Sequence, residues 1–140
     1  MDLDKLIRRF QRADRATRLD ALLDASRKLP PLPEPLAVAS ERERHRVPEC
    51  QTPVFLWLDA ERGRLRFHAD VPRESPTVRG FVSLLVGALD GQPPEVAAKL
   101  PLDLLHLMGL DQALGMMRTQ GLSAIVARVR QRGAELARGG

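Results

Sequence analysis

Hydrophobic residues recur at three- and four-residue intervals between residues 2 and 29, a spacing that is typical of an amphipathic helix. Ala13, Asp14 and Ala16 interrupt this stripe, so the pattern predicts a bend or a break there. Prolines between residues 30 and 35 end the helix, because proline lacks an amide donor and restricts the residue before it. We expect residues 30–49 to form a loop or an extended stretch. The stripe itself consists of Leu3, Leu6, Ile7, Phe10, Leu19, Leu22, Leu23 and Leu29.

A strand pattern follows in residues 54–69. Residues 54–58 are an apolar run rich in strand formers, and residues 59–63 supply turn chemistry. Leu65, Phe67 and Ala69 then alternate with polar residues, as in a strand that has one face in water. Because the first strand is apolar on both faces, each side of this hairpin needs a cover, and we expect helices to provide it.

The rest of the chain is predicted to be helical. Ser75 and Pro76 are suited to the N-cap and the first position of a helix that is apolar almost all round, and we expect this helix at the centre of the core. Prolines start and stop a short helix between residues 93 and 101, and residues 103–108 make a further turn or two. Residues 122–137 have the pattern of a final amphipathic helix.

These elements define an α+β fold class. A small antiparallel sheet of about three strands is predicted to pack against helices from both chain ends, and no internal repeat is evident. The chain has 140 residues, which is a common size for one domain and is enough to bury one core. We therefore expect a single domain over residues 1–140.

Composition and charge narrow the function classes. No apolar run approaches the ~18 residues of a membrane span, and the acidic start of the chain lacks the basic and apolar regions of a secretory signal. We therefore expect a cytoplasmic protein that does not bind membranes. The net charge of +4 admits nucleic acid or an acidic protein as a partner. The arginines are spread among acidic and apolar residues, however, and stacking aromatics are few, so we expect solvated helix faces and no nucleic acid.

Cysteine and histidine usage bears on metal binding. Cys50 is the only cysteine, which excludes a disulfide within the chain and a zinc or cluster site built from several of its own thiolates. His45, His68 and His106 lie far apart in sequence without ligand-like spacing. We expect neither a bound metal nor a cofactor.

Cys50 lies between Pro48 and Pro53 on a loop that leads into the first strand. Scaffolds position such loops for chemistry, and a thiol there can act as a nucleophile when nearby cations lower its pKa from ~8.5. A lone intracellular cysteine is more often a small buried hydrophobic residue. A cysteine hydrolase would need a histidine within reach, and His45 is the nearest one upstream. The residues alone leave these three interpretations open.

Three segments carry a further signal. Residues 49–54 read Glu-Cys-Gln-Thr-Pro-Val and precede the apolar strand that contains Trp57. Residues 69–80 contain Ala-Asp, a short charged turn and Thr-Val-Arg-Gly, and residues 117–122 read Met-Arg-Thr-Gln-Gly-Leu. In this order they resemble the SufE family of sulfur-acceptor proteins, with its cysteine loop and its arginine-to-glycine segment before the last helix. Together with the leading helix, the resemblance covers nearly the whole chain.

The resemblance implies a fold like that of the U-type cluster scaffolds and a carrier protein rather than an enzyme. Cys50 matches the acceptor cysteine, which takes persulfide sulfur from a PLP-dependent, SufS-like cysteine desulfurase, stimulates that enzyme and serves a SufBCD-like iron–sulfur scaffold complex. Arg118 matches an arginine near the cysteine loop, where it aids docking or thiolate stabilisation; a structural salt bridge or helix cap is the alternative. Gln51 and His45 are further supporting residues. With one cysteine, the chain resembles an acceptor and not a scaffold.

The chain departs from the family pattern at Glu49, where many members carry glycine. A carboxylate beside the thiol is expected to oppose its ionisation, and glycine alone reaches positive φ freely. Because a persulfide is reactive, we expect Cys50 to be partly buried at rest and exposed when the partner binds. Two other function classes remain as alternatives: a basic helical module for nucleic acid or an acidic protein partner, and a cysteine-dependent hydrolase.

Overall fold

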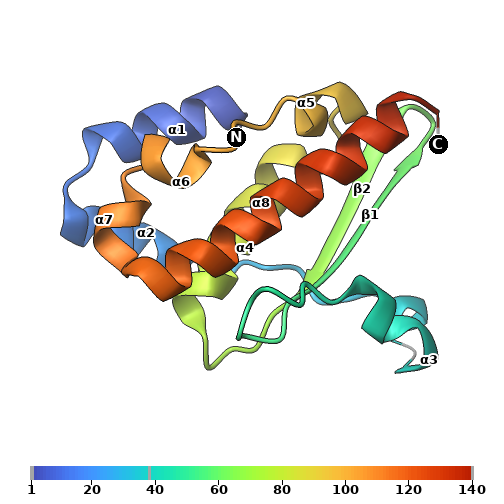
Figure 1. Ribbon diagram of the computed structural model, residues 1–140, viewed down its shortest axis with the longest axis horizontal. Coiled ribbons are helices and arrows are strands. Elements are labelled where there is room, and N and C mark those ends of the chain that lie inside the picture. Colours follow the sequence, from blue (N-terminus) through green and yellow to red (C-terminus); the bar gives the residue numbers. More distant parts are fainter. Residues whose placement is uncertain (1, 38, 140) are drawn as a thin grey trace.

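A β-hairpin and helices from both ends of the chain make up the fold (Figure 1). The computed structural model describes residues 2–37 and 39–139. Met1, Val38 and Gly140, which belong to the predicted domain of residues 1–140, lie outside the described residues. The predicted α+β fold class is confirmed.

The interrupted apolar stripe at the start of the chain forms two helices. Helix α1 (Leu3–Arg12) ends at Ala13, and α2 (Arg15–Ser26) begins after Asp14, so the predicted break is present. The Asp14 carboxylate accepts a hydrogen bond of 2.8 Å from the Thr17 backbone amide and thereby caps α2.

The segment after the prolines differs from the predicted loop. It contains the short helices η1 (Glu34–Ala37), α3 (Ala39–Arg42) and η2 (Glu43–His45). Proline is compatible with the first turn of a helix, and the glutamates and arginines that follow are good helix formers. We call residues 34–37 and 39–46 the arm.

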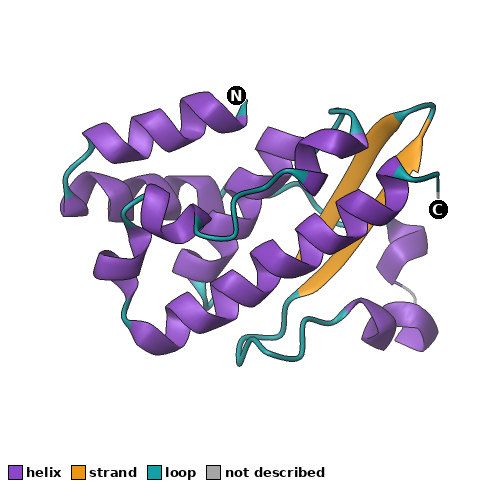
Figure 2. Ribbon diagram, turned by 45° about the horizontal axis from the view of Figure 1, so that its top comes forward, coloured by secondary structure: helices purple, strands orange, loops and turns teal. Residues whose placement is uncertain are grey.

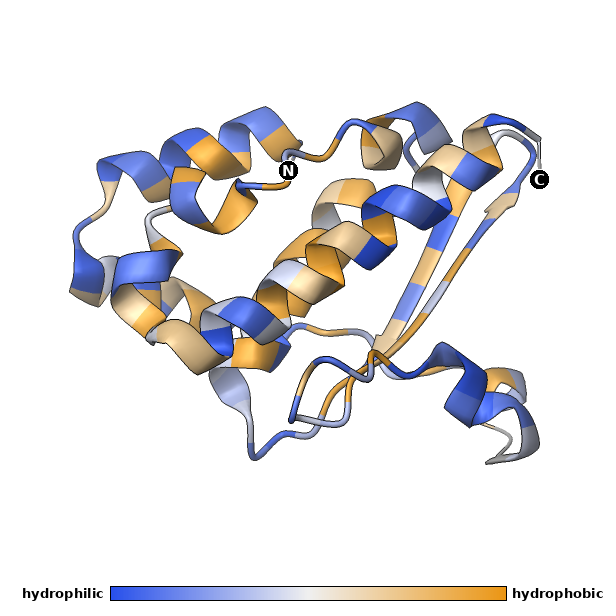
Figure 3. Ribbon diagram, in the orientation of Figure 1, coloured by the Kyte–Doolittle hydropathy of each residue, from blue (hydrophilic) through white to orange (hydrophobic). Residues whose placement is uncertain are grey.

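Strands β1 (Phe55–Glu61) and β2 (Arg64–Asp70) form an antiparallel hairpin with Phe55 opposite Asp70. In β2 the buried residues alternate with exposed or half-buried ones, as the period of two predicted, and Figure 3 shows this alternation in colour. Leu56 and Leu58 of β1 belong to the main core.

The prediction of about three strands is wrong, because the described residues form a sheet of two strands. The outer edge of β2 is already occupied: the Leu65 amide donates to the Gln92 carbonyl at 2.7 Å, and the Gly91 amide donates to the Leu65 carbonyl at 2.8 Å. Beside β1, Arg46 and Phe55 form an isolated antiparallel bridge in place of a third strand.

Helix α4 (Pro76–Leu89) lies at the centre of the core, as its apolar sequence predicted, and is coloured hydrophobic along much of its length in Figure 3. Ser75 is the N-cap residue, but its hydroxyl makes no capping hydrogen bond. Gly80 lets α4 approach α2 closely, since a Cβ at this position would lie 2.0 Å from the Leu22 carbonyl oxygen.

The two faces of β1 are covered differently. Leu56 and Leu58 pack in the core with the helices, whereas Phe55 and Trp57 are covered by the arm. The Arg42 guanidinium lies 4.0 Å from the centre of the Phe55 ring, and the His45 ring stacks on Trp57 with 5.0 Å between centres. The cover on this second face is therefore the arm and not one of the predicted helices.

The last helix is longer than predicted. It begins at Met116 instead of Leu122, because Gly115, with a φ of 82°, separates it from the preceding helix and Gly121 continues it without a break. Figure 2 shows it lying across the hairpin. None of the described helices is long and apolar enough to cross a membrane. The helices after α4 are α5 (Pro94–Ala98), α6 (Leu104–Leu107), α7 (Leu110–Leu114) and α8 (Met116–Ala137).

Candidate functional site: the cysteine loop and the start of helix α8

Residues 47–54, which we call the cysteine loop, connect the arm to β1. The bridge between Arg46 and Phe55 closes the base of this loop, and the Val47 amide donates a 2.9 Å hydrogen bond to the Val54 carbonyl. Within the loop, the Cys50 amide donates to the Val47 carbonyl at 3.2 Å, as in a β-turn. The loop is thus tied at its base, with Cys50 at the end of its first turn.

The Cys50 side chain is buried. Its exposed fraction is 6%, and it belongs to the hydrophobic core together with Val47 and Val54. Its sequence neighbours Glu49 and Gln51 are exposed. The predicted burial of the resting thiol is therefore confirmed, and a buried thiol lies directly beneath an exposed polar rim.

Gly121 of α8 is the close neighbour of this thiol. A Cβ added to Gly121 would lie 3.1 Å from Cys50 Sγ, 3.4 Å from its Cα and 3.5 Å from its Cβ. Sulfur and carbon are ordinarily further apart than 3.1 Å, so a side chain at position 121 would push on the loop. The absence of a side chain at Gly121 lets the cysteine loop rest against α8.

The environment of the thiol favours its protonated form. Burial raises the pKa of Cys50, which outweighs the hydrogen bonds from Thr52 and the charge of Arg46 that act in the opposite direction. A thiol in this state is a poor nucleophile, because the thiolate is the reactive form. Exposure of the loop removes the desolvation and brings the thiol closer to the pKa of a free cysteine.

Glu49 fits the loop without a special backbone conformation. Among the described non-glycine residues, only Arg62 has a positive φ, so Glu49 does not occupy a conformation that favours glycine. Its side chain is exposed. Glycine in place of Glu49 is therefore not required for this loop to close.

Arg118 lies in the first turn of α8 and is exposed. It precedes Gly121 by three residues, and residues at this spacing share a helix face. Within the described part of the chain its side chain makes no hydrogen bond and no ion pair, and the residue at the helix N-cap is Gly115. The structure thus leaves the guanidinium available to a partner, on the same helix face as the residue that contacts Cys50.

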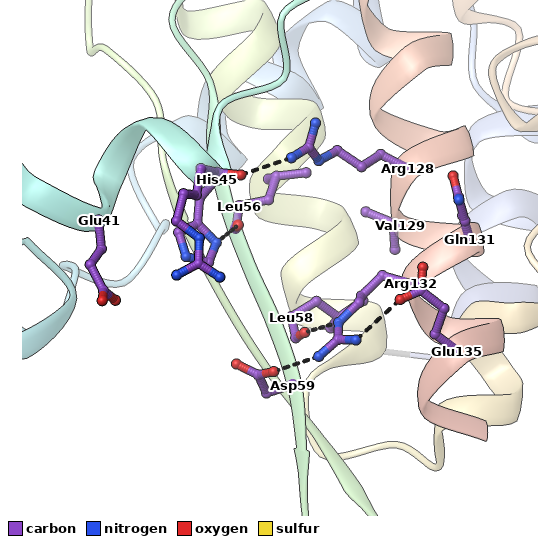
Figure 4. A pocket seen from close by; sticks show the side chains of 11 residues that line it. Glu41, His45, Leu56, Leu58, Asp59, Arg128, Val129, Gln131, Arg132 and Glu135 are labelled. Carbon is purple, nitrogen blue, oxygen red and sulfur yellow. Dashed lines mark hydrogen bonds and ion pairs between the residues drawn. The ribbon is translucent and has the colours of Figure 1, made fainter. Parts of the chain in front are cut away.

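His45 lies elsewhere in this region. Its Nδ1 is 3.0 Å from the Leu56 carbonyl oxygen, and its ring stacks on Trp57. His45 lines a cavity of about 560 Å³ between the arm, β1 and α8. Figure 4 shows the side chains that line this cavity, Arg128 and Arg132 among them. Among the described residues, no hydrogen bond joins His45 to Cys50, so this histidine holds the arm on β1 and not the thiol.

Three residues near Cys50 were not among those predicted from the sequence. Gly121 contacts the thiol, while Thr52 and Arg46 act on its ionisation. Gly121 was part of the segment that resembles the family, which was the one available signal; Thr52 and Arg46 flank the cysteine. In residues 2–37 and 39–139, no three His, Cys, Asp or Glu side chains gather in a way that could hold a metal ion.

Comparison with known proteins places this site in a family. A family model described as "SufE: Fe-S metabolism associated domain" matches residues 4–133. The chain belongs to the SufE family. The match includes both the cysteine loop and the start of α8, so the predicted family is confirmed.

Individual relatives agree with the SufE assignment. An uncharacterized SufE-like protein of Mycobacterium tuberculosis is 37% identical over 131 residues, which cover 93% of this chain and 90% of the relative. The sulfur acceptor protein CsdE of Escherichia coli is 32% identical over 106 residues, covering 74% of this chain and 68% of CsdE. The solution structure of a hypothetical protein from Thermus thermophilus superimposes with a TM-score of 0.81 at 33% identity and covers 100% of both chains.

Proposed function

We propose that this SufE protein is a sulfur carrier that accepts persulfide sulfur on Cys50 from a PLP-dependent cysteine desulfurase. It stimulates that enzyme and delivers the sulfur to an iron–sulfur scaffold complex. The observation that carries the proposal is the single cysteine, buried in a tied loop against Gly121, in a chain of this family. The similarity to CsdE, a sulfur acceptor protein, supports it.

The transfer requires one nucleophile from this chain. The Cys50 thiolate attacks the terminal sulfur of the donor's cysteine persulfide, a new S–S bond forms on Cys50 Sγ, and the donor cysteine leaves as a thiolate. The bond that breaks is the donor's own S–S bond, so the sulfane sulfur moves without a net oxidant or reductant. The proton released by the Cys50 thiol balances the charge of the departing thiolate.

In the resting state, burial protects the thiol of Cys50 that is to carry the sulfur. With 6% of Cys50 exposed, the cysteine persulfide of a donor protein does not reach Sγ in bonding geometry without displacement of the loop. Displacement of the loop breaks the packing of Cys50 on Gly121 and the hydrogen bond from the Cys50 amide to the Val47 carbonyl. The bridge between Arg46 and Phe55 stays in place, and the loop pivots about it. Opening of the cysteine loop therefore also makes Cys50 more nucleophilic, because exposure to solvent lowers the pKa of its thiol.

Stimulation of the desulfurase follows from removal of its product. The donor enzyme cannot begin a new turnover while its cysteine carries the terminal sulfur, so an acceptor that removes this sulfur raises the rate. Gln51 is exposed next to Cys50 in the sequence, and Arg118 is exposed three residues before Gly121; both are suited to contact the donor during this step. His45 supports the site indirectly, through the arm that leads into the loop.

The proposal is tested with a purified SufS-type cysteine desulfurase and cysteine as substrate. We expect the rate of alanine release to rise when the wild-type protein is added, and to stay at the basal rate with Cys50→Ser. Leu102→Ser, which changes an exposed side chain at 59% exposure, is the matched control and keeps the stimulation. A folded wild-type protein that leaves the rate of alanine release unchanged, with the SufS-type enzyme and with other cysteine desulfurases, would contradict the proposal.

A further inference from the structure

Two large apolar side chains are exposed at the start of α8. Met116 is 77% exposed and Met117 is 66% exposed, which makes them the two most exposed large hydrophobic residues among those described. Exposed apolar side chains that lie together mark interaction sites more often than those that lie singly. Methionine is suited to this role because its flexible thioether adapts to the shape of a partner.

The helical spacing places Met117 and Arg118 on the side of α8 that covers the thiol. Met117 precedes Gly121 by four residues and Arg118 precedes it by three, so both share the helix face on which Gly121 contacts Cys50. Met116 lies about 140° around the helix from Gly121, where it lines a shallow surface hollow of about 510 Å³ with Thr119 and Gln120. The start of α8 therefore presents Met117 and Arg118 on the side of the cysteine loop, and Met116 and the hollow on the adjoining side of the helix. Arg118 makes no ion pair within the described part of the chain.

Sulfur transfer determines what must cover this surface. The donor sulfur has to come within bonding distance of Cys50 Sγ, which lies beneath the cysteine loop and the first turns of α8. Any protein that delivers sulfur to Cys50 must consequently pack over these turns. Burial of two methionines in that contact favours binding, and the free guanidinium of Arg118 favours a carboxylate on the donor.

We propose that Met116 and Met117 form an apolar anchor for docking of the cysteine desulfurase, which brings an apolar depression with a carboxylate at its rim to the start of α8. This inference rests on the proposed function. The docked partner replaces the packing between Gly121 and the loop, so that binding and exposure of Cys50 occur together.

The test is a titration of a SufS-type cysteine desulfurase with the variant Met116→Ser/Met117→Ser, and alanine release is the readout. We expect the concentration for half-maximal stimulation to rise at least tenfold, whereas the maximal rate at saturation stays near that of the wild type. Leu102→Ser, which removes a similarly exposed apolar side chain between α5 and α6, changes this concentration less than twofold. Circular dichroism verifies that each variant is folded, and Met117→Leu retains the wild-type concentration because it keeps an apolar side chain.

The outcomes separate this inference from the proposed function. A wild type that stimulates the enzyme, with a double variant that titrates identically, overturns the anchor and leaves the sulfur carrier intact. A wild type without any effect overturns both. Sedimentation of the protein alone gives a further criterion: self-association that the double variant abolishes, without a change in the titration, assigns the patch to a second copy of this chain and overturns the desulfurase as its occupant.

Discussion

Replacing Gly121 with alanine adds one methyl group where α8 meets the cysteine loop. The new Cβ would lie 3.1 Å from Cys50 Sγ, so the loop must move by a few tenths of an ångström or open. Overpacking of this kind typically costs about 1–3 kcal/mol. Alanine also favours the helix by about 1 kcal/mol over glycine, but this gain is the same whether the loop is closed or open.

The cost therefore falls on the closed loop alone. A destabilisation of about 1–3 kcal/mol raises the population of the open loop roughly 5- to 150-fold. Thiol reagents modify Cys50 from the open loop, because only 6% of the side chain is exposed at rest. We expect the labelling rate of Gly121→Ala to rise by the same factor. The free energy of global unfolding falls by no more than about 2 kcal/mol, because the gain in helix propensity offsets about 1 kcal/mol of the cost.

The assay is the rate of reaction of the native protein with a bulky aromatic disulfide at neutral pH, followed by absorbance. Gly87→Ala is the matched control, since Gly87 also lies within a helix but a Cβ there meets no atom within 4 Å. The control shares the change in helix propensity and lacks the contact with Cys50, so we expect it to label at the wild-type rate. Equal rates for Gly121→Ala and the wild type would refute the packing role of Gly121.

Three further perturbations test other parts of the account. Burial raises the pKa of Cys50, so the pH midpoint for alkylation of the native protein lies above the ~8.5 of a free cysteine. The stability that the neutral thiol contributes is present below pH ~8.5 and is lost as the pH rises through the folded-state pKa. Urea titrations of the wild type and Cys50→Ser at several pH values measure this loss. Gly80→Ala places a Cβ 2.0 Å from the rigid Leu22 carbonyl and lowers the free energy of unfolding in urea by at least about 3 kcal/mol; a loss below about 1 kcal/mol is incompatible with the close contact of α2 and α4. Arg42→Ala removes a partly exposed ion pair with Asp70 and the contact with the Phe55 ring, and lowers the free energy of unfolding by about 1 kcal/mol, whereas Arg42→Lys recovers part of the loss.

The elements with a strong local pattern were predictable. The break at Asp14, the alternation in β2 and the apolar helix from Pro76 each depend on residues close in sequence, and each is present. The arm was not predicted, because prolines precede it and its contacts with Phe55 and Trp57 arise only in the folded chain. The third strand was predicted in error because the sequence does not show that residues 90–92 bond to the edge of β2.

The same division applies to the site. The loop position of Cys50 left three interpretations open, and the resemblance to the family singled out Cys50 and Arg118. The burial of Cys50 was predicted from the reactivity of the persulfide that this resemblance implies. Gly121 was not predictable as a contact, since its approach to the thiol depends on where α8 crosses the cysteine loop. The early start of α8 was missed for a related reason, because glycine at position 121 normally weakens a helix and here its small size serves the packing.

The central claim is that Cys50 carries the sulfur. Its most direct test is the intact mass of the protein after incubation with a SufS-type cysteine desulfurase and cysteine, recorded with and without reductant. The account predicts a gain of whole sulfur atoms that reductant removes and that Cys50→Ser lacks. An unchanged mass of the folded wild type in the presence of an active enzyme, or an equal gain on Cys50→Ser, would contradict it.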